Sequence, residues 1–144
     1  MLIGEYRHTL DSKKRVSLPS KFRKELGKKV VISKGLDNCL FVLDPKRWEA
    51  FVSKLANAHF GQRDGRDLSR FIIAGAVETD VDAAGRILIP DNLKDHARLK
   101  EQVVVMGVHS RVELWSEESW NTYSAGVAQQ ADAIAERLGE MGMI

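Results

Sequence analysis

Hydrophobic and polar positions follow one order along the chain, and that order occurs twice. A short alternating stretch leads to a tight polar turn, an arginine, a second short apolar stretch and a proline. Alternation with a period of two predicts β-strands, and a proline at the following position suits the first turn of a helix. The pattern therefore predicts, in each half of the chain, two strands joined by a tight turn and then a short helix.

The two copies align residue by residue. Residues 11–23 read DSKKRVSLPSKFR and residues 82–94 read DAAGRILIPDNLK, which is a shift of 71 positions. The matched pairs of this stretch are Asp11/Asp82, Arg15/Arg86, Val16/Ile87, Leu18/Ile89, Pro19/Pro90 and Phe22/Leu93. After a one-residue slip the match continues to Gly35/Gly107 and Trp48/Trp120. The chain is thus an internal repeat of one β-rich unit.

Each copy predicts the same series of elements. The predicted strands are residues 6–10, 15–18, 30–33 and 39–43 in the first copy and 77–81, 86–89, 102–106 and 111–115 in the second. Short helices are predicted at 20–26 and 91–99. A closing helix follows Asp44 and Pro45 in the first copy and Ser116 in the second, because these residues favour helix starts. The expected organisation is a first half-motif over 1–56, a helical connecting segment over 57–74 and a second half-motif over 75–144.

Neither half is large enough to bury a stable core alone, since each has only about 70 residues with short strands. We therefore expect the halves to pack as a pseudo-two-fold pair and to complete one another's sheet. Strand edges left over would favour assembly into a ring or larger oligomer.

Composition fits a globular protein, with 44% hydrophobic and 29% charged residues. Cys39 is the single cysteine, so an internal disulfide is impossible and a reducing, cytoplasmic setting is expected. Charge is unevenly distributed. Residues 1–72 carry 16 Lys and Arg against 8 Asp and Glu, whereas residues 73–144 carry 6 against 12. This asymmetry indicates a polyanionic partner, nucleic acid first, or else a solvated basic face that only confers solubility.

The repeated Asp-x-x-x-Arg-hydrophobic-x-hydrophobic-Pro pattern, together with AGAVETDVDAAGRILIP over residues 74–90, resembles the MraZ family of bacterial regulators. The resemblance covers essentially the whole chain. It implies an α+β fold in which two tandem AbrB-like half-motifs form a pseudo-two-fold swapped-hairpin barrel with flanking helices. It also implies a ring-forming homo-oligomer that binds repeated short boxes of double-stranded DNA. Such a regulator would be cytoplasmic and nucleoid-associated and would act on the division and cell-wall gene cluster that includes its own gene.

One position departs from the family pattern. The first turn of each copy usually reads Asp-x-Lys-Gly-Arg in this family, and here Lys14 replaces the glycine that Gly85 retains in the second copy. If the position requires a positive φ, lysine costs about 1 kcal/mol relative to glycine. The departure concerns the shape of the first turn and not the family resemblance.

The resemblance places the DNA-contacting face at Arg15 and Arg86. A guanidinium presents a rigid fork of donors that can match guanine O6 and N7 or a phosphate. The alternative is that each arginine pairs with the aspartate four positions earlier and only braces the turn. The supporting candidates, which suit phosphate contacts better than base contacts, are Lys13, Lys14, Lys21 and Arg23.

No catalytic, cofactor or metal motif stands out. The four histidines have no metal-ligand spacing, and the glycines form no phosphate-binding pattern. We expect a protein that is not an enzyme and has no cofactor, membrane partner or small-molecule substrate. Two other functions stay open, an assembly or protein-binding module such as an antitoxin-like partner, and an RNA-binding protein.

Overall fold

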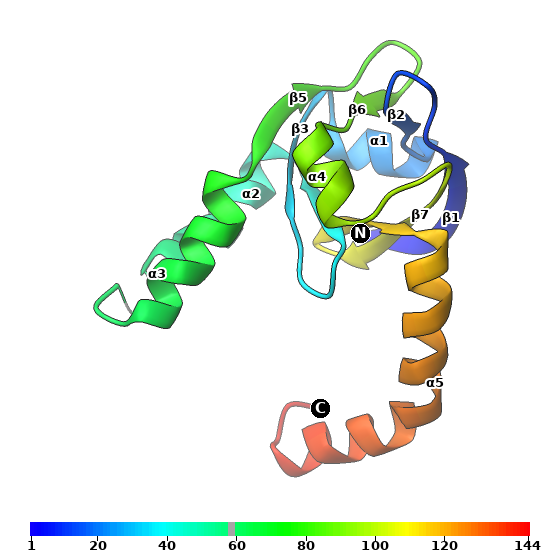
Figure 1. The fold of residues 1–144 in the computed structure, drawn as a ribbon. Coiled ribbons are helices and arrows are strands. Elements are labelled where there is room, and N and C mark those ends of the chain that lie inside the picture. Colours follow the sequence, from blue (N-terminus) through cyan, green and yellow to red (C-terminus); the bar gives the residue numbers. More distant parts are fainter. Residues whose placement is uncertain (58–59) are drawn as a thin grey trace.

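The chain folds into a mixed α+β structure, which a computed structural model describes over residues 1–57 and 60–144 (Figure 1). Its strands are Leu2–Thr9 (β1), Arg15–Ser17 (β2), Lys29–Lys34 (β3), Leu40–Leu43 (β4), Val77–Asp80 (β5), Arg86–Leu88 (β6), Gln102–His109 (β7) and Arg111–Ser116 (β8). Its helices are Ser20–Leu26 (α1), Pro45–Asn57 (α2), Arg63–Ser69 (α3), the π-helical turn Arg70–Ala74 (η1), Asp91–His96 (α4) and Glu117–Glu140 (α5).

The strands of the two halves interleave in one sheet. Six strands follow the order β1-β7-β8-β4-β3-β5, and every neighbouring pair is antiparallel. The first strand of each half pairs with the third strand of the other half, β1 with β7 and β5 with β3. The second strands, β2 and β6, pair only with each other in a separate antiparallel ribbon. Each half therefore completes the sheet of the other, as their small size predicts.

The expected closed barrel is not seen among the described strands. The six-stranded sheet ends at β1 and β5, and the β2–β6 ribbon packs against the same core without joining the ladder of that sheet. Val16 and Ile87, which face each other in the ribbon, are both fully buried in the main cluster. The ribbon thus covers the core through side-chain packing rather than through hydrogen bonds to the sheet.

Two short helices complete the core. Phe22 and Leu26 of α1 and Leu93 of α4 point inward and are nearly inaccessible to solvent. A second, smaller cluster lies around Phe41 and Trp115, and α2 and α5 contribute Trp48, Phe51 and Trp120 to it. All three tryptophans thus take part in hydrophobic packing.

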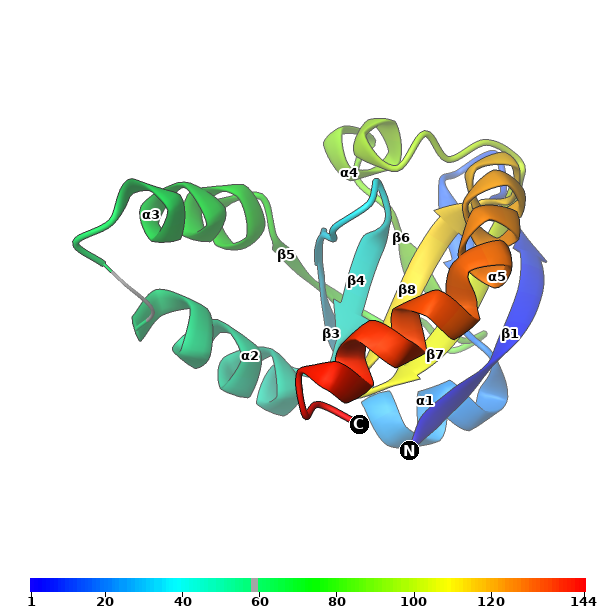
Figure 2. The same cartoon turned by 90° about the horizontal axis from the view of Figure 1, so that it is seen from below.

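The remaining helices extend away from the sheet. Figure 2 shows α2 and α3 side by side as one arm, while α5 begins beside the sheet and reaches past it. Neither α2, α3 nor α5 has a buried residue, and Ile72 of η1 is buried. The segment expected to connect the halves contains α3 and η1, and its residues 58–59 lie outside the described part of the chain. No helix in the described ranges is long and apolar enough to span a membrane.

Several elements differ in length from their predicted ranges. β1 begins at Leu2 rather than at residue 6, because Leu2 is fully buried and Gly4 lies opposite Gly107 in the β1–β7 ladder. β7 extends to His109 for the same reason. α4 ends at His96 rather than at residue 99, since Arg98 has a φ of 54°, which a right-handed helix does not allow.

The close approach of β1 to β7 yields a stability prediction. A Cβ at Gly107 would lie 2.6 Å from the backbone nitrogen of Ile3 and 2.6 Å from the carbonyl carbon of Leu2. Gly107→Ala should therefore force the strands apart and cost about 2 kcal/mol, or roughly 4–8 °C in Tm.

The matched control is Gly126→Ala in α5, where a Cβ meets no atom within 4 Å. Alanine favours helix, so this variant should not lower Tm in the same thermal-denaturation experiment. Equal Tm values for Gly107→Ala and the wild type would show that the strands do not depend on this approach.

Candidate nucleic-acid interface

The two repeated turns are built from one set of hydrogen bonds. In the first turn Asp11 Oδ1 accepts from the backbone N–H of Lys13 and of Arg15, each at 2.9 Å, and Asp11 Oδ2 accepts from Arg15 Nε at 2.8 Å. In the second turn Asp82 accepts from the N–H of Ala84, the N–H of Arg86 and Arg86 Nε, at 3.0, 2.8 and 2.9 Å. The Asp-x-x-x-Arg spacing is thus the spacing of a turn closed by its own carboxylate.

Both turns place their fourth residue in the left-handed region. The φ of Lys14 is 62° and that of Gly85 is 81°. The position therefore has a positive φ in both copies, and Lys14 adopts it without the freedom of a glycine. The Lys14 side chain forms an ion pair with Asp91 at the start of α4, but both groups are exposed, so the pair offsets little of the cost.

Hydrogen bonds between the halves fix the two turns beside the ribbon. The Gly85 carbonyl accepts from the N–H of Leu18 at 2.9 Å, and the Lys14 carbonyl accepts from the N–H of Ile89 at 2.8 Å. Each turn is therefore held by the strand end of the other half. In Figure 1 the ribbon and both turns lie at one end of the molecule, with α3 and the end of α5 at the opposite end.

Arg15 and Arg86 flank this ribbon with half-buried side chains. Their side chains are 27% and 34% exposed, and each Nε is bonded to the aspartate of its own turn. Within the described residues, the terminal amino groups of these two guanidinium groups donate no hydrogen bond to the protein. The bracing of the turn that the sequence left as an alternative is therefore present, and it orients each arginine while leaving the rest of its fork free.

The supporting candidates do not form one cluster. Lys13 lies exposed on the first turn, Lys21 lies exposed on α1, and Arg23 packs against the second turn. A Cβ at Gly85 would lie 2.1 Å from Arg23 Nη1, so the guanidinium occupies the space that glycine leaves. Arg23 Nε is buried without a hydrogen-bond partner within the described chain. The second turn, which has no lysine of its own, thus receives its extra positive charge from the first half.

Part of the charge asymmetry between the halves is satisfied inside the molecule. Besides the Lys14–Asp91 pair, Lys29 Nζ lies 3.4 Å from Glu78 and Arg7 Nε lies 3.4 Å from Glu117. In all three pairs the base belongs to the first half and the acid to the second. The excess positive charge that could face a polyanion is therefore smaller than the sequence count indicates.

The carboxylates of Asp11 and Asp82 each accept several hydrogen bonds from protein groups. Donation from the backbone N–H of Arg15 lowers the pKa of Asp11, and donation from the backbone N–H of Arg86 lowers the pKa of Asp82. The arginine side chains lower both values further. Both aspartates therefore stay ionised to a lower pH than an ordinary aspartate does.

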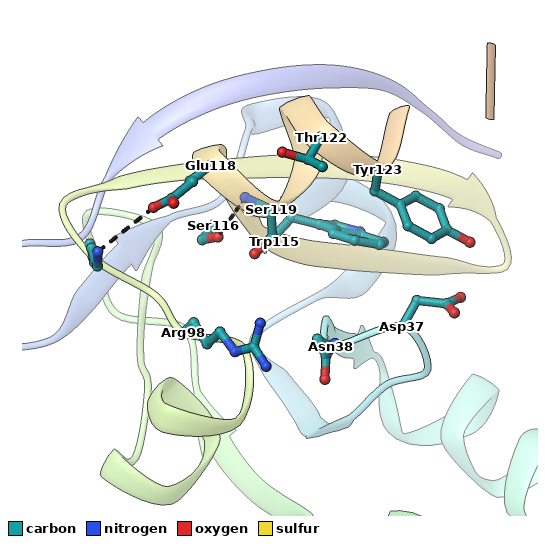
Figure 3. Close-up of a pocket in the computed structure, with 10 residues that line it drawn as sticks. Asp37, Asn38, Arg98, Trp115, Ser116, Glu118, Ser119, Thr122 and Tyr123 are labelled. Atoms are coloured by element: carbon teal, nitrogen blue, oxygen red, sulfur yellow. Dashed lines mark hydrogen bonds and ion pairs between the residues drawn. The ribbon is translucent and has the colours of Figure 1, made fainter. Parts of the chain in front are cut away.

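A separate hollow of about 570 Å³ lies away from the ribbon, between the β3–β4 turn and the start of α5. Figure 3 shows Arg98 directed toward Asn38, with Trp115 and Tyr123 along the wall. Ser116 caps α5 here by accepting from the N–H of Ser119 at 3.0 Å. These residues form a polar hollow around a helix start. No residue of the two repeated turns, 11–15 and 82–86, lines it.

Cys39 and the histidines form no site in the described part of the chain. Cys39 is a buried free cysteine that packs in the smaller hydrophobic cluster, and burial raises the pKa of its thiol. No group of three or more potential metal ligands occurs among the described residues. His59 lies outside those residues.

Comparison with known proteins identifies the repeat. The family model for MraZ protein, which is described as antitoxin-like, matches twice, over residues 1–71 and 72–140. The chain belongs to the MraZ family. A protein of Thermoanaerobacter sp. (strain X514) is 47% identical over 143 residues, covering 99% of this chain and 100% of its own. One from Caldicellulosiruptor saccharolyticus is 48% identical with the same coverage, and both are named transcriptional regulator MraZ.

A solved structure shows only a distant likeness to this MraZ-family chain. The solution structure of PHS018 from Pyrococcus horikoshii is 13% identical, covers 79% of this chain and 88% of its own, and has a TM-score of 0.33.

The lowered pKa values predict how the turns respond to acid. A carboxyl group whose pKa is lower in the folded state stabilises the fold above its ordinary pKa of 3.8, and this contribution is lost as the pH falls through the folded value. The double variant Asp11→Asn, Asp82→Asn should have a lower Tm than the wild type at pH 6 and a smaller decrease in Tm between pH 6 and pH 3.

Asp132→Asn on exposed α5 is the control and should reproduce the wild-type decrease. If the double variant lost as much Tm on acidification as the wild type, the two aspartates would not be the groups that hold the turns.

Proposed function

We propose that this MraZ-family protein is a sequence-specific DNA-binding transcriptional regulator, and that the β2–β6 ribbon with its two turns is its DNA-contacting face. The observation that carries the proposal is the pair of aspartate-braced arginines, one from each half, on a ribbon held by reciprocal hydrogen bonds. The names of the relatives, transcriptional regulator MraZ, agree with this function.

The ribbon has the dimensions and chemistry for the major groove. A two-stranded antiparallel ribbon fits the major groove of B-DNA, where guanine presents two acceptors to an arginine fork. Bracing by Asp11 and Asp82 fixes the guanidinium planes before binding, so less side-chain entropy is lost on contact. Arg15 and Arg86 would contact base edges, while Lys13, Lys14, Lys21 and Arg23 would lie near phosphates.

The proposal includes a homo-oligomeric ring that binds several short repeated boxes upstream of the division and cell-wall gene cluster containing its own gene. Exposed apolar side chains on α5 support an assembly. Tyr123 and Val127 of α5 are 41% and 42% exposed, and α5 has no buried residue. Apolar helix faces left open to solvent are typical of protein interfaces. In this proposal the protein is cytoplasmic and nucleoid-associated and has no enzymatic activity.

A protein-binding role is the second candidate, because the matching family model is described as antitoxin-like. In that case the arginines would brace the turns and contribute nothing to DNA affinity. The two functions therefore differ in what happens when one arginine is removed.

Arg15→Ala should lower affinity for duplex DNA from upstream of the protein's own gene by roughly tenfold to a hundredfold, because a bidentate base contact is lost. Fluorescence anisotropy with this duplex and with a scrambled duplex would measure the preference for the native sequence. Arg15→Lys keeps the charge but not the fork, so it should lose the preference for the native duplex more than the total affinity.

The matched control is Arg70→Ala in η1, an arginine that also pairs with an aspartate, at 3.0 Å from Asp67. It should bind like the wild type. Equal affinity of the wild type, Arg15→Ala and Arg86→Ala for both duplexes would favour the protein-binding candidate.

The lysines of the first turn should contribute to the salt dependence of DNA affinity. Each phosphate contact contributes about 0.9 to the slope of log affinity against log salt concentration. The double variant Lys13→Ala, Lys14→Gly should bind more weakly and with a shallower slope, and glycine at position 14 keeps the positive φ accessible.

Lys46→Ala, Lys54→Ala on the exposed face of α2 removes the same charge far from the ribbon and should leave the slope unchanged. A slope that fell equally in both double variants would mean that net charge alone, and not the turn, determines the response.

A further inference from the structure

The outer face of the ribbon consists of four side chains. Val16 and Ile87 point into the core and are fully buried, so their strand neighbours point to the other side. The register places Arg15 opposite Leu88 and Ser17 opposite Arg86. The face is therefore a two-by-two arrangement in which the arginines occupy one diagonal, and Ser17 and Leu88 occupy the other.

The two positions of the second diagonal are equivalent in the repeat but carry different side chains. The 71-residue shift that aligns Arg15 with Arg86 also aligns Ser17 with Leu88. Ser17 is half-buried, whereas Leu88 is 53% exposed and lies directly opposite Arg15 in the ribbon. One corner of the face thus presents a small hydroxyl, and the matching corner presents a large apolar side chain to solvent.

Leu88 has no packing role that would require leucine. Val16 and Ile87 already fill the core beneath the ribbon. Ile87 and Ile89, the chain neighbours of Leu88, are both fully buried. In the major groove the only apolar group on a base edge is the C5-methyl of thymine. A leucine next to a base-reading arginine is suited to that methyl group.

We infer that Leu88 reads the 5-methyl group of a thymine next to the base pair contacted by Arg15. This inference rests on the proposed function and names one specificity determinant of that face. Side chains directly opposite in an antiparallel ribbon have Cβ atoms about 4.5–5.5 Å apart, and successive bases of one strand are about 3.4 Å apart. Neighbouring corners of the face can therefore reach neighbouring bases.

The inequality of Ser17 and Leu88 gives the face a direction. Two arginines related by the pseudo-dyad would read a symmetric pair of bases equally well in either orientation. A methyl contact at only one corner gives the two orientations of the DNA different affinities. The recognised box is accordingly asymmetric, with its thymine on the side of Leu88.

The test removes the methyl group from the DNA and the leucine from the protein. The probe is the duplex from upstream of the protein's own gene, amplified either with thymidine or with deoxyuridine triphosphate, which differ only in the 5-methyl group. Burial of one methyl group is worth about fourfold in affinity. The wild type should bind the thymine duplex at least about fourfold more tightly than the uracil duplex, and Leu88→Ser should bind both equally.

The control is Leu36→Ser, which changes a leucine of similar exposure, 51%, on the β3–β4 turn. It should keep the wild-type ratio between the two duplexes. Ser17→Leu provides a second measurement, because a methyl-reading side chain at the matching corner should reduce the discrimination between the two orientations of the duplex.

The outcomes separate this inference from the proposed function. A wild type that prefers its own upstream duplex to a scrambled one, but binds thymine and uracil forms equally, overturns the role of Leu88 alone. The same holds if Leu88→Ser keeps the wild-type ratio, and a changed molar mass of that free variant would then place Leu88 in a contact between subunits. Absence of any preference for the native duplex overturns both.

Discussion

The reciprocal hydrogen bonds between the two turns are the contact on which the ribbon depends. β2 and β6 are only three residues long, and each finds its ladder partner in the other half of the chain. The carbonyls of Lys14 and Gly85 accept from the strand ends that follow β6 and β2, so each turn is held by the other half in addition to its own internal hydrogen bonds. A half-motif alone would leave these backbone groups without hydrogen-bond partners at a buried edge. The free-energy cost of burying them unpaired would exceed the stabilisation that two three-residue strands provide.

This mutual dependence also explains the charge pattern. Acidic residues of the second half neutralise basic residues of the first at three places in the molecule, Lys14–Asp91, Lys29–Glu78 and Arg7–Glu117. Each exposed pair contributes little to stability. Together they favour the contact between unlike halves over the contact between like ones, because two copies of the basic half would repel each other. The charge asymmetry thus serves the contact between the two halves as well as the free surface.

Much of the architecture could be predicted from the sequence because repeat and turn chemistry are local. The Asp-x-x-x-Arg spacing fixes the turn, the glycine of the second copy indicates the positive φ, and alternation identifies the strands. The strand order could not be predicted, since pairing of β1 with β7 depends on contacts about 100 residues apart. Nor could the place of Arg23, which crosses from α1 to fill the space above Gly85. The expected barrel closure is absent from the described strands because β2 and β6 pair only with each other.

Covalent linkage of the two halves has a consequence for how such a face can evolve. A homodimer of one half-motif would carry every substitution twice, so its binding surface would stay symmetric whatever mutation arose. In this chain Lys14 and Gly85 occupy the same position with a positive φ, yet the first has a cationic side chain of its own and the second leaves space that Arg23 fills. Gene duplication followed by fusion separates the fate of the two copies, and a single mutation can then break a symmetry that two separate subunits would have to preserve.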